Sequence, residues 1–189
     1  MQKKITNLGI DLKLIFKDYV NLNEKELVDI LNLRNQKNIR ENMANDELIS
    51  LENHLNWVKT LEKNENKKYF AIDFEDEIVG SLSFVKNKKE VNWGVFFKNE
   101  ISPFVSSAST FVFLDFLFLN VCEELYSYVK KENLKAVSFN KSFGFKVYKE
   151  DEDCFYLNLQ KLSWEKHKNS KLLKPIKNYL DKIEYIFEE

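Results

Sequence analysis

Two polar side chains in the first third of the chain have the chemistry of a catalytic or binding site. His54 is one of two histidines, and its imidazole can act as a general base or contact a nucleotide. The alternative is a solvated or hydrogen-bonded histidine on a helix. Arg34 ends an apolar helical pattern beside Asn35. Its planar guanidinium can hold a phosphate or a carboxylate, or else form a surface ion pair.

Aromatic and amide side chains near these residues also have two interpretations. Trp57 lies three residues after the histidine and can stack on a base or a sugar, or pack onto a sheet. Met43 lies in a polar loop where a small molecule would enter. Asn133 precedes a helical pattern, so it is a site residue, an N-cap, or both. Asp115 lies inside an apolar helix and is either paired in the core or close to a site.

Other site chemistries have no counterpart in the sequence. The histidines and the two cysteines, Cys122 and Cys154, have no metal-ligand spacing and no Cys/His or Ser/His/Asp arrangement, so we expect no metal. We expect the cysteines to be reduced and buried. The N-terminal residues lack an apolar signal-peptide region, and the apolar stretch 111–119 is short and contains a charge. These features predict a cytoplasmic protein.

Composition limits the remaining classes of function. A chain of 189 residues normally forms one domain with a substantial core. Basic and acidic residues number 29 and 30, so the net charge is −1. This balance gives no general attraction to nucleic acid or to an anionic membrane, and we expect neither as a partner.

The elements that must position these residues follow from the hydrophobic pattern. Their order mixes an antiparallel meander with βαβ crossovers, which predicts an α+β or mixed α/β fold around one sheet. Gly144 should close the last core helix in the left-handed region. The predicted strands are 12–20, 68–74, 78–85, 91–97, 125–129, 145–148 and 154–159, and the predicted helices are 24–35, 51–63, 106–120 and 134–142.

The last part of the chain has a different pattern. From Trp164 onward it is rich in lysine, with an apolar stripe at helical spacing and Pro175 in the first turn of the main helix. We therefore predict a core domain over residues 1–161 and a C-terminal helical extension over 162–189. The extension would cap the domain or pair with a partner, and a homo-oligomer could form through it or through a sheet edge.

Four segments and the element order resemble the Gcn5-related N-acetyltransferase (GNAT) superfamily from about Leu12 to Leu159. The segments are Leu31–Asn35, Glu52–Trp57, Trp93–Phe96 and Asn133–Phe145. Within the superfamily, the chain resembles the N-acetyltransferases of nucleotide-linked amino sugars in pseudaminic acid biosynthesis, a step toward flagellin glycosylation. The resemblance implies acetyl-CoA as the donor and a small amine acceptor. It also implies a mixed, mostly antiparallel sheet with splayed fourth and fifth strands.

The resemblance also assigns roles to residues. The exposed backbone of the fourth strand would pair with pantetheine, and an N–H of Val95 or Phe96 would stabilise the tetrahedral oxyanion. The acceptor would lie against Arg34, Asn35, Met43, His54 and Trp57. The residues implied to bind the donor are Val95, Phe96, Phe97, Phe104, Val105, Ser106, Ser107, Ala108, Ser109, Asn133 and Phe139.

Two positions depart from the family pattern. The loop that usually reads Gln/Arg-x-x-Gly-x-Gly/Ala fits best at Pro103 to Ala108, where Pro103 replaces the first residue and Ser106 the first glycine. The amides of Ser106 to Ser109 would still offer a helix N-terminus to the diphosphate. Asn140 stands where many members have a tyrosine that protonates the leaving thiolate, and an amide cannot deliver that proton.

Two functions therefore compete. The first is an N-acetyltransferase in which an amine attacks the thioester directly, with His54 or a water as the base and Asn140 near the sulfur. The second is a non-catalytic protein of the same fold that binds an acyl-CoA or a protein partner. The substitutions at Pro103, Ser106 and Asn140 are the support for the second function.

Overall fold

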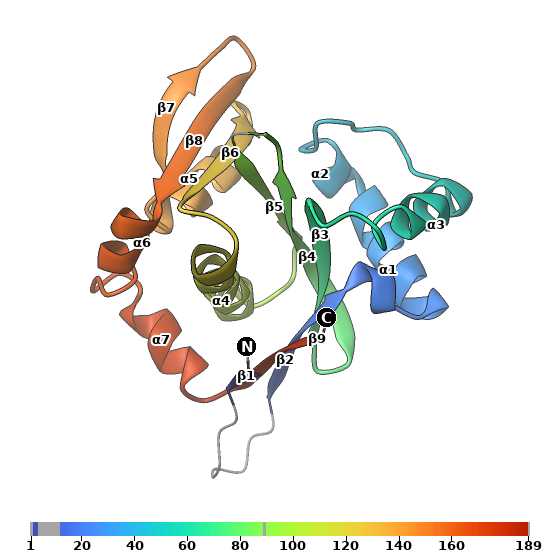
Figure 1. The fold of residues 1–189 in the computed structure, drawn as a ribbon, viewed down its shortest axis with the longest axis horizontal. Coiled ribbons are helices and arrows are strands. Elements are labelled where there is room, and N and C mark those ends of the chain that lie inside the picture. Colours follow the sequence, from blue (N-terminus) through green and yellow to red (C-terminus); the bar gives the residue numbers. More distant parts are fainter. Residues whose placement is uncertain (1, 4–11, 89, 189) are drawn as a thin grey trace.

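The computed structural model describes residues 2–3, 12–88 and 90–188 (Figure 1). In this part of the chain nine strands form one sheet in the order β1-β9-β2-β3-β4-β5-β6-β8-β7. The strands are β1 (Gln2–Lys3), β2 (Lys13–Asp18), β3 (Lys67–Phe74), β4 (Glu77–Lys86), β5 (Val91–Phe97), β6 (Glu124–Lys130), β7 (Lys146–Glu150), β8 (Cys154–Gln160) and β9 (Glu184–Glu188). The helices are α1 (Glu24–Asn35), α2 (Lys37–Arg40), α3 (Leu51–Lys59), α4 (Pro103–Asn120), α5 (Leu134–Ser142), α6 (Lys161–His167) and α7 (Lys174–Leu180), with a 3₁₀ turn at Tyr19–Asn21.

The sheet is mixed and mostly antiparallel, as predicted. The two parallel pairings are β2 with β9 and β5 with β6. Figure 1 shows α1, α2 and α3 on one side of the central strands and α4 on the other. Side chains alternate between these layers along β3: Phe70 and Ile72 join the core under α4, and Ala71 joins the core under α1.

Local sequence signals explain where several helices begin and end. Asn23 forms a capping box with Glu26, and the hydroxyl of Ser50 accepts a hydrogen bond from the amide of Asn53. Gly144 follows α5 with φ of 93°, the left-handed conformation that the sequence predicts.

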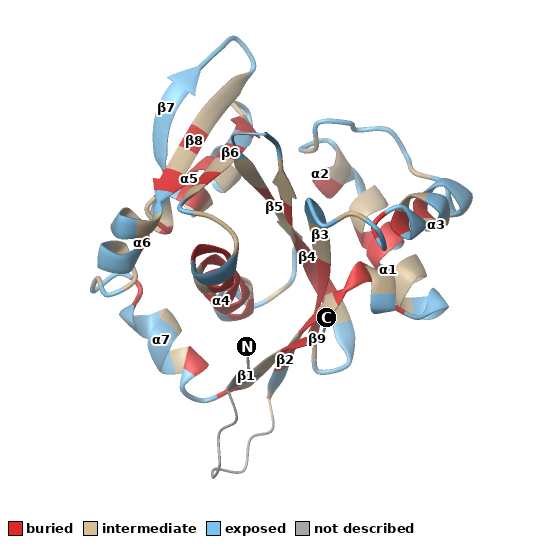
Figure 2. Ribbon diagram, viewed as in Figure 1, coloured by how far each residue is buried: buried red, intermediate tan, exposed pale blue. Residues whose placement is uncertain are grey.

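The helix α4 is the centre of the larger core. By length and composition alone this helix is apolar enough to cross a membrane, and 61% of its residues are buried inside the structure. Phe113, Leu114 and Leu117 on this helix are fully buried. Its apolar character is therefore that of a core helix, as the sequence analysis expected (Figure 2).

The prediction of one C-terminal helix is wrong. Residues 161–188 form two short helices and then β9, which inserts between β1 and β2. The proline lies in the first turn of α7, and this helix ends at Leu180. The following run from Tyr185 to Phe187 contains aromatic and β-branched residues, which favour a strand. The C-terminal segment thus completes the sheet.

The two strands expected to separate do so. Between the fully described strands β5 and β6, pairing is confined to Val91 with Leu125 and Asn92 with Tyr126. Both strands continue beyond that point, to Phe97 and Lys130. The edge of β5 that faces β6 is therefore unpaired from Trp93 onward.

Candidate active site

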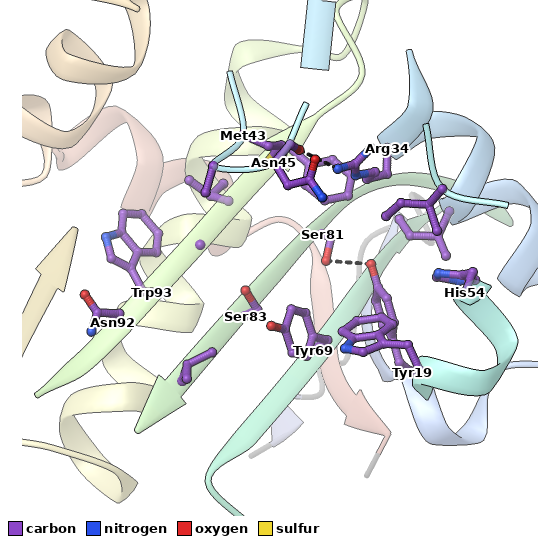
Figure 3. A pocket seen from close by; sticks show the side chains of 18 of the residues that line it. Tyr19, Arg34, Met43, Asn45, His54, Tyr69, Ser81, Ser83, Asn92 and Trp93 are labelled. Carbon is purple, nitrogen blue, oxygen red and sulfur yellow. Dashed lines mark hydrogen bonds between the residues drawn. The ribbon is translucent and has the colours of Figure 1, made fainter. Parts of the chain in front are cut away.

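A cavity of about 770 Å³ lies between the helices α1 and α3, the loop after α2, and the strands β3 to β5 (Figure 3). Five consecutive residues of β5, from Asn92 to Phe96, line it. Successive residues of a strand point to opposite faces, so a cavity that touches all five reaches the edge of the strand. Tyr128 of β6 lines it as well. The cavity therefore extends to the gap where β5 and β6 part.

The floor of the cavity is a cluster of aromatic rings. Trp57 packs edge-on against Tyr69, with ring centroids 4.8 Å apart, and its centroid lies 6.0 Å from that of Tyr19. The hydroxyl of Tyr19 donates to the Oγ of Ser81 over 2.9 Å, as the dashed line in Figure 3 marks. Burial raises the pKa of Tyr19, so the phenol stays protonated. Trp57 thus forms part of this floor, as the packing interpretation expected, and still borders the cavity.

His54 is buried beside Trp57 in the same cluster, with ring centroids 5.7 Å apart, and has a free ring nitrogen. Its side chain is 5% exposed, and Nε2 has no hydrogen-bond partner among the described residues. Burial lowers the pKa of His54 because the charged imidazolium loses its solvation. The imidazole is therefore neutral at pH 7, which is the form that accepts a proton.

Arg34 holds the loop that covers the cavity. Its guanidinium donates to the carbonyl oxygens of Asn45 and Glu47 over 2.6 and 2.5 Å. It forms no ion pair within the described residues, so the surface ion pair is not its role. Asn35, the next residue, exchanges two hydrogen bonds with the backbone of Ile49 and does not line the cavity. Both residues therefore position the loop, which brings Met43 to the cavity.

The prediction that free amides of Ser106 to Ser109 bind the diphosphate is wrong, because these amides are already hydrogen-bonded within the helix. The helix α4 begins at Pro103, one turn earlier than expected. The amides of Val105 and Ser106 both donate to the carbonyl of Ser102, over 3.0 and 3.2 Å. The following amides lie inside the helix, where each donates to the carbonyl oxygen four residues earlier. The side chains of Ala108 and Ser109 are also buried.

Asn140 is not placed as a donor to a ligand. Its side chain is 2% exposed, and its Nδ2 donates to the carbonyl of Ala136 over 2.9 Å. Its Oδ1 has no partner among the described residues. Flipping the amide would place this oxygen against the Ala136 carbonyl, so the donor end stays turned toward the helix.

The other predicted donor-site residues lie outside the cavity. Asn133 is the N-cap of α5, since its Oδ1 accepts from the amide of Ala136 over 3.0 Å, and its contact with pantetheine stays a prediction. Phe104 is 48% exposed and stacks on Tyr179, with centroids 5.5 Å apart. Phe139 packs against Phe143 of the same helix region. Asp115 is paired in the core, where it accepts from Trp164 and Lys168.

The sequence analysis missed several residues of the cavity. Ser81 and Ser83 interrupt the apolar strand β4 at alternate positions, a period-two pattern that places both on one face. Gly94 lies opposite Ser83 in the strand register, and a Cβ there would lie 2.8 Å from the Oγ of this serine. The alternating serines are a signal that could have been used. The remaining missed lining residues include Tyr19, Asn45, Asn53, Tyr69, Asn87, Asn92 and Tyr128.

Comparison with known proteins identifies the fold. No family model matches the chain. A curated relative, acetyltransferase PseH of Campylobacter jejuni, is 29% identical over 146 residues, which cover 76% of this chain and 92% of the relative. The crystal structure of C. jejuni N-acetyltransferase PseH superimposes with a TM-score of 0.63 at 26% identity, covering 78% of this chain and 97% of that one. This chain has the GNAT fold.

A second solved structure agrees. Apo FdhC, described as a nucleotide-linked sugar GNAT, superimposes with a TM-score of 0.66 at 20% identity, over 86% of this chain and 96% of that one, and supports the fold alone. C. jejuni PseH has also been solved in complex with acetyl coenzyme A. The expected fold and the expected enzyme class, an N-acetyltransferase, are confirmed. No cluster of three potential metal ligands exists within the described residues.

Proposed function

We propose that this GNAT-fold chain transfers the acetyl group of acetyl-CoA to the amine of a nucleotide-linked amino sugar. One observation carries the proposal: the cavity borders five consecutive residues of β5 at the point where this strand leaves β6. An acceptor in the cavity and a thioester in the gap would therefore meet at Val95. The relative PseH, an acetyltransferase, supports the same chemistry.

The donor would bind along the separated strands. Pantetheine has two amides, which pair with the unpaired backbone edge of β5 like an added strand. The diphosphate cannot use the first turn of α4, whose amides are occupied, but the loop before the helix is suitable. Within the described residues, the amides of Asn99, Glu100 and Ser102 donate to no backbone acceptor. We place the diphosphate on this loop.

The lining of the cavity favours a sugar over a polycationic amine. Among the described residues that line it, Glu47 is the one carboxylate, whereas a polyamine needs several. Apart from the guanidinium of Arg34 and the imidazole of His54, most of the other polar side chains are neutral amides, hydroxyls and phenols, which hydrogen-bond to sugar hydroxyls. The aromatic cluster around Trp57 suits the apolar faces of a sugar ring or a base. Arg34, with part of its guanidinium still unbonded, is the candidate contact for a phosphate.

The reaction needs little beyond positioning. The neutral amine attacks the thioester carbonyl, and the resulting oxyanion accepts a hydrogen bond from the amide of Val95 or Phe96. His54 is neutral, and its Nε2 is unbonded but buried from solvent, so the imidazole would take the proton that the amine loses after its ring turns toward the cavity. The C–S bond then breaks and CoA leaves as a thiolate. Asn140 contributes no proton to this step.

A coupled pair of measurements tests the proposal. Acetyl-CoA at sub-millimolar concentration should raise the melting temperature. Thiol release should then appear with a nucleotide-linked amino sugar and not with spermidine. Acetylation of spermidine but not of the nucleotide-linked amino sugar would contradict the proposed acceptor. Absence of both stabilisation and thiol release would favour the non-catalytic alternative. A role in flagellin glycosylation stays a prediction.

A further inference from the structure

A row of tyrosine rings covers the sheet beside the cavity. Tyr128 of β6 lies directly opposite Tyr156 of β8 in the strand register. Tyr126, two residues earlier on β6, faces the same way and contacts Tyr148 of β7 edge to face, with centroids 5.8 Å apart. The register of β7 shifts between Val147 and Lys149, and this irregularity turns Tyr148 onto the same side. We call these four residues the tyrosine face.

The tyrosine face is open because the helix α5 covers the opposite side. The alternate residues Leu125, Val129 and Leu157 belong to the core, together with Val137 of α5 and Phe143 directly after it. By contrast, Tyr128 is 51% exposed and Tyr148 is 50% exposed. Figure 2 shows the whole of β7 as exposed and β8 as largely intermediate.

Hydrogen bonds hold two of the rings in place. The hydroxyl of Tyr126 donates to Glu124 over 2.8 Å, and that of Tyr156 donates to Asp151 over 2.7 Å. These bonds to carboxylates raise the pKa of both tyrosines to about 12, so the phenols stay neutral. Each carboxylate is bound at the hydroxyl end of its ring. A base that stacks on Tyr156 would have to displace the Lys149 ammonium or use the side of the ring that it leaves open.

Two lysines supply positive charge on this side of the sheet. The Nζ of Lys149 lies 4.9 Å from the centre of the Tyr156 ring. The Nζ of Lys130 donates to the carbonyl of Glu41 over 2.7 Å and so reaches from β6 to the end of α2. Within the described residues neither lysine forms an ion pair with a carboxylate. The carboxylates of Glu124 and Asp151 border the same face, and the hydrogen bond from Tyr156, with the charge of Lys149, lowers the pKa of Asp151. Lys130, whose ammonium binds a backbone carbonyl, is therefore the less neutralised of the two lysines.

We propose that the tyrosine face binds the nucleobase of the acceptor, with Lys130 and Lys149 facing its phosphates. The inference rests on the proposed function and adds a subsite to it. Tyr128 makes the face continuous with the cavity, because it lines both. From β6 to β7 the face spans two strand spacings, about 10 Å, comparable with an extended diphosphate and ribose. Stacking on phenol rings tolerates any base, since each base has a π face.

Nucleotide binding to the full chain tests the subsite directly. Uridine, cytidine and guanosine diphosphates are titrated by calorimetry with CoA present at saturation, which blocks the donor site. We expect at least one of them to bind the wild type. The variant Tyr148→Ala/Tyr156→Ala should lose affinity on the order of 10-fold or more, because two stacking rings are removed. The variant Tyr148→Phe/Tyr156→Phe keeps the rings and should retain the affinity.

Several outcomes would overturn the inference. They are equal affinity of the alanine variant and the wild type, failure of all three diphosphates to bind at millimolar concentration, or a change from dimer to monomer in the alanine variant with binding unchanged. The last would make the face a contact between two copies. Leu162→Ala, an exposed change on α6, controls for general effects. Acetylation of a nucleotide-linked amino sugar with the same KM in the alanine variant and the wild type would refute only this inference. Acetylation of no amino sugar would refute the proposed function.

Discussion

At the scale of single residues, the cavity brings together a group that can react and a group that holds the covering loop. His54 is buried with a free Nε2, whereas Arg34 uses its guanidinium to hold backbone carbonyls. Both were candidates in the sequence because of their chemistry, but their roles depend on neighbours far along the chain. Asn140 shows the same point. Its position in the family pattern suggests a contact with the thioester, but its side chain donates instead to the carbonyl of Ala136.

The substitution His54→Asn tests the base and its titration together. It should lower kcat about 100-fold, the low end for general-base catalysis, and leave the KM for acetyl-CoA unchanged. Thiol release at several acceptor concentrations measures both constants. If kcat falls by less than about threefold, the role of the histidine is structural and not catalytic.

The same variant makes a prediction about stability and pH. Burial lowers the pKa of His54 below its ordinary value of 6.5 in the folded protein, so the unfolded chain binds the proton more readily. The wild type should lose stability as the pH falls through 6.5, and the variant should lack this contribution. The difference in unfolding free energy, wild type minus variant, should therefore shrink from pH 7 to pH 5. Urea unfolding across this range measures it, and parallel curves would contradict the prediction.

At the scale of elements, local signals predicted most boundaries, and failures came where a distant partner or a competing pattern decided. Ser50 begins one helix and Gly144 ends another as expected, because caps act within a few residues. The start of α4 was misplaced because the family motif was preferred over Ser102-Pro103, which is itself a helix start signal. β9 could not be predicted, since its partner β2 lies about 170 residues earlier and its lysine-rich surroundings have helical period.

The helix start makes Ser106→Gly a sharp test of where the diphosphate binds. The amide of Ser106 already donates to Ser102, so glycine there should not improve acetyl-CoA binding. It should instead lower the free energy of unfolding by about 0.5 kcal/mol, the difference in helix propensity. Thermal unfolding with and without acetyl-CoA measures both effects. Tighter binding in this variant would place the diphosphate on α4 rather than on the loop before it.

The loop after α2 gives a second test at this scale. Arg34→Lys keeps the charge but loses the fork that holds the carbonyls of Asn45 and Glu47. We expect the KM for the acceptor to rise on the order of 10-fold, with the KM for acetyl-CoA unchanged, because two charge-assisted hydrogen bonds are lost. Lys37→Ala on α2, where the lysine pairs with Glu41 at the surface, is the matched control. Wild-type kinetics for Arg34→Lys would show that charge alone suffices.

At the scale of the whole molecule, the C-terminal segment belongs to the same core as the catalytic fold. Trp164, Leu173 and Leu180 are buried in the cluster that contains α4. The relatives match about three quarters of this chain and nearly all of themselves, so this chain has residues that they lack. The apolar stripe of the segment was visible in the sequence. The element against which the stripe packs was not visible, because an apolar stripe shows that a face is buried but does not identify its packing partner.

Phe187 on β9 tests whether the segment and the rest of the chain unfold together. Its ring stacks on Phe16 and Phe116, with centroids 4.3 and 4.7 Å away, and meets Phe70 edge-on. Phe187→Ala removes a buried ring from the larger core, between the sheet and α4, and should cost about 3–5 kcal/mol. Leu172→Ala, at a 60% exposed position of the same segment, should change stability by less than about 0.5 kcal/mol.

The shape of the transition then decides between one unit and two. If β9 is integral to the sheet, Phe187→Ala lowers a single melting transition seen alike by circular dichroism and by tryptophan fluorescence. Trp57 and Trp93 report on the cavity side, and Trp164 reports on the segment. A separate domain over residues 162–189 would instead lose its own transition, while the melting of the remainder and its stabilisation by acetyl-CoA stayed unchanged. Because Phe187 contacts both β2 and α4, we expect the single transition, and with it weaker protection by acetyl-CoA at any fixed temperature near the midpoint.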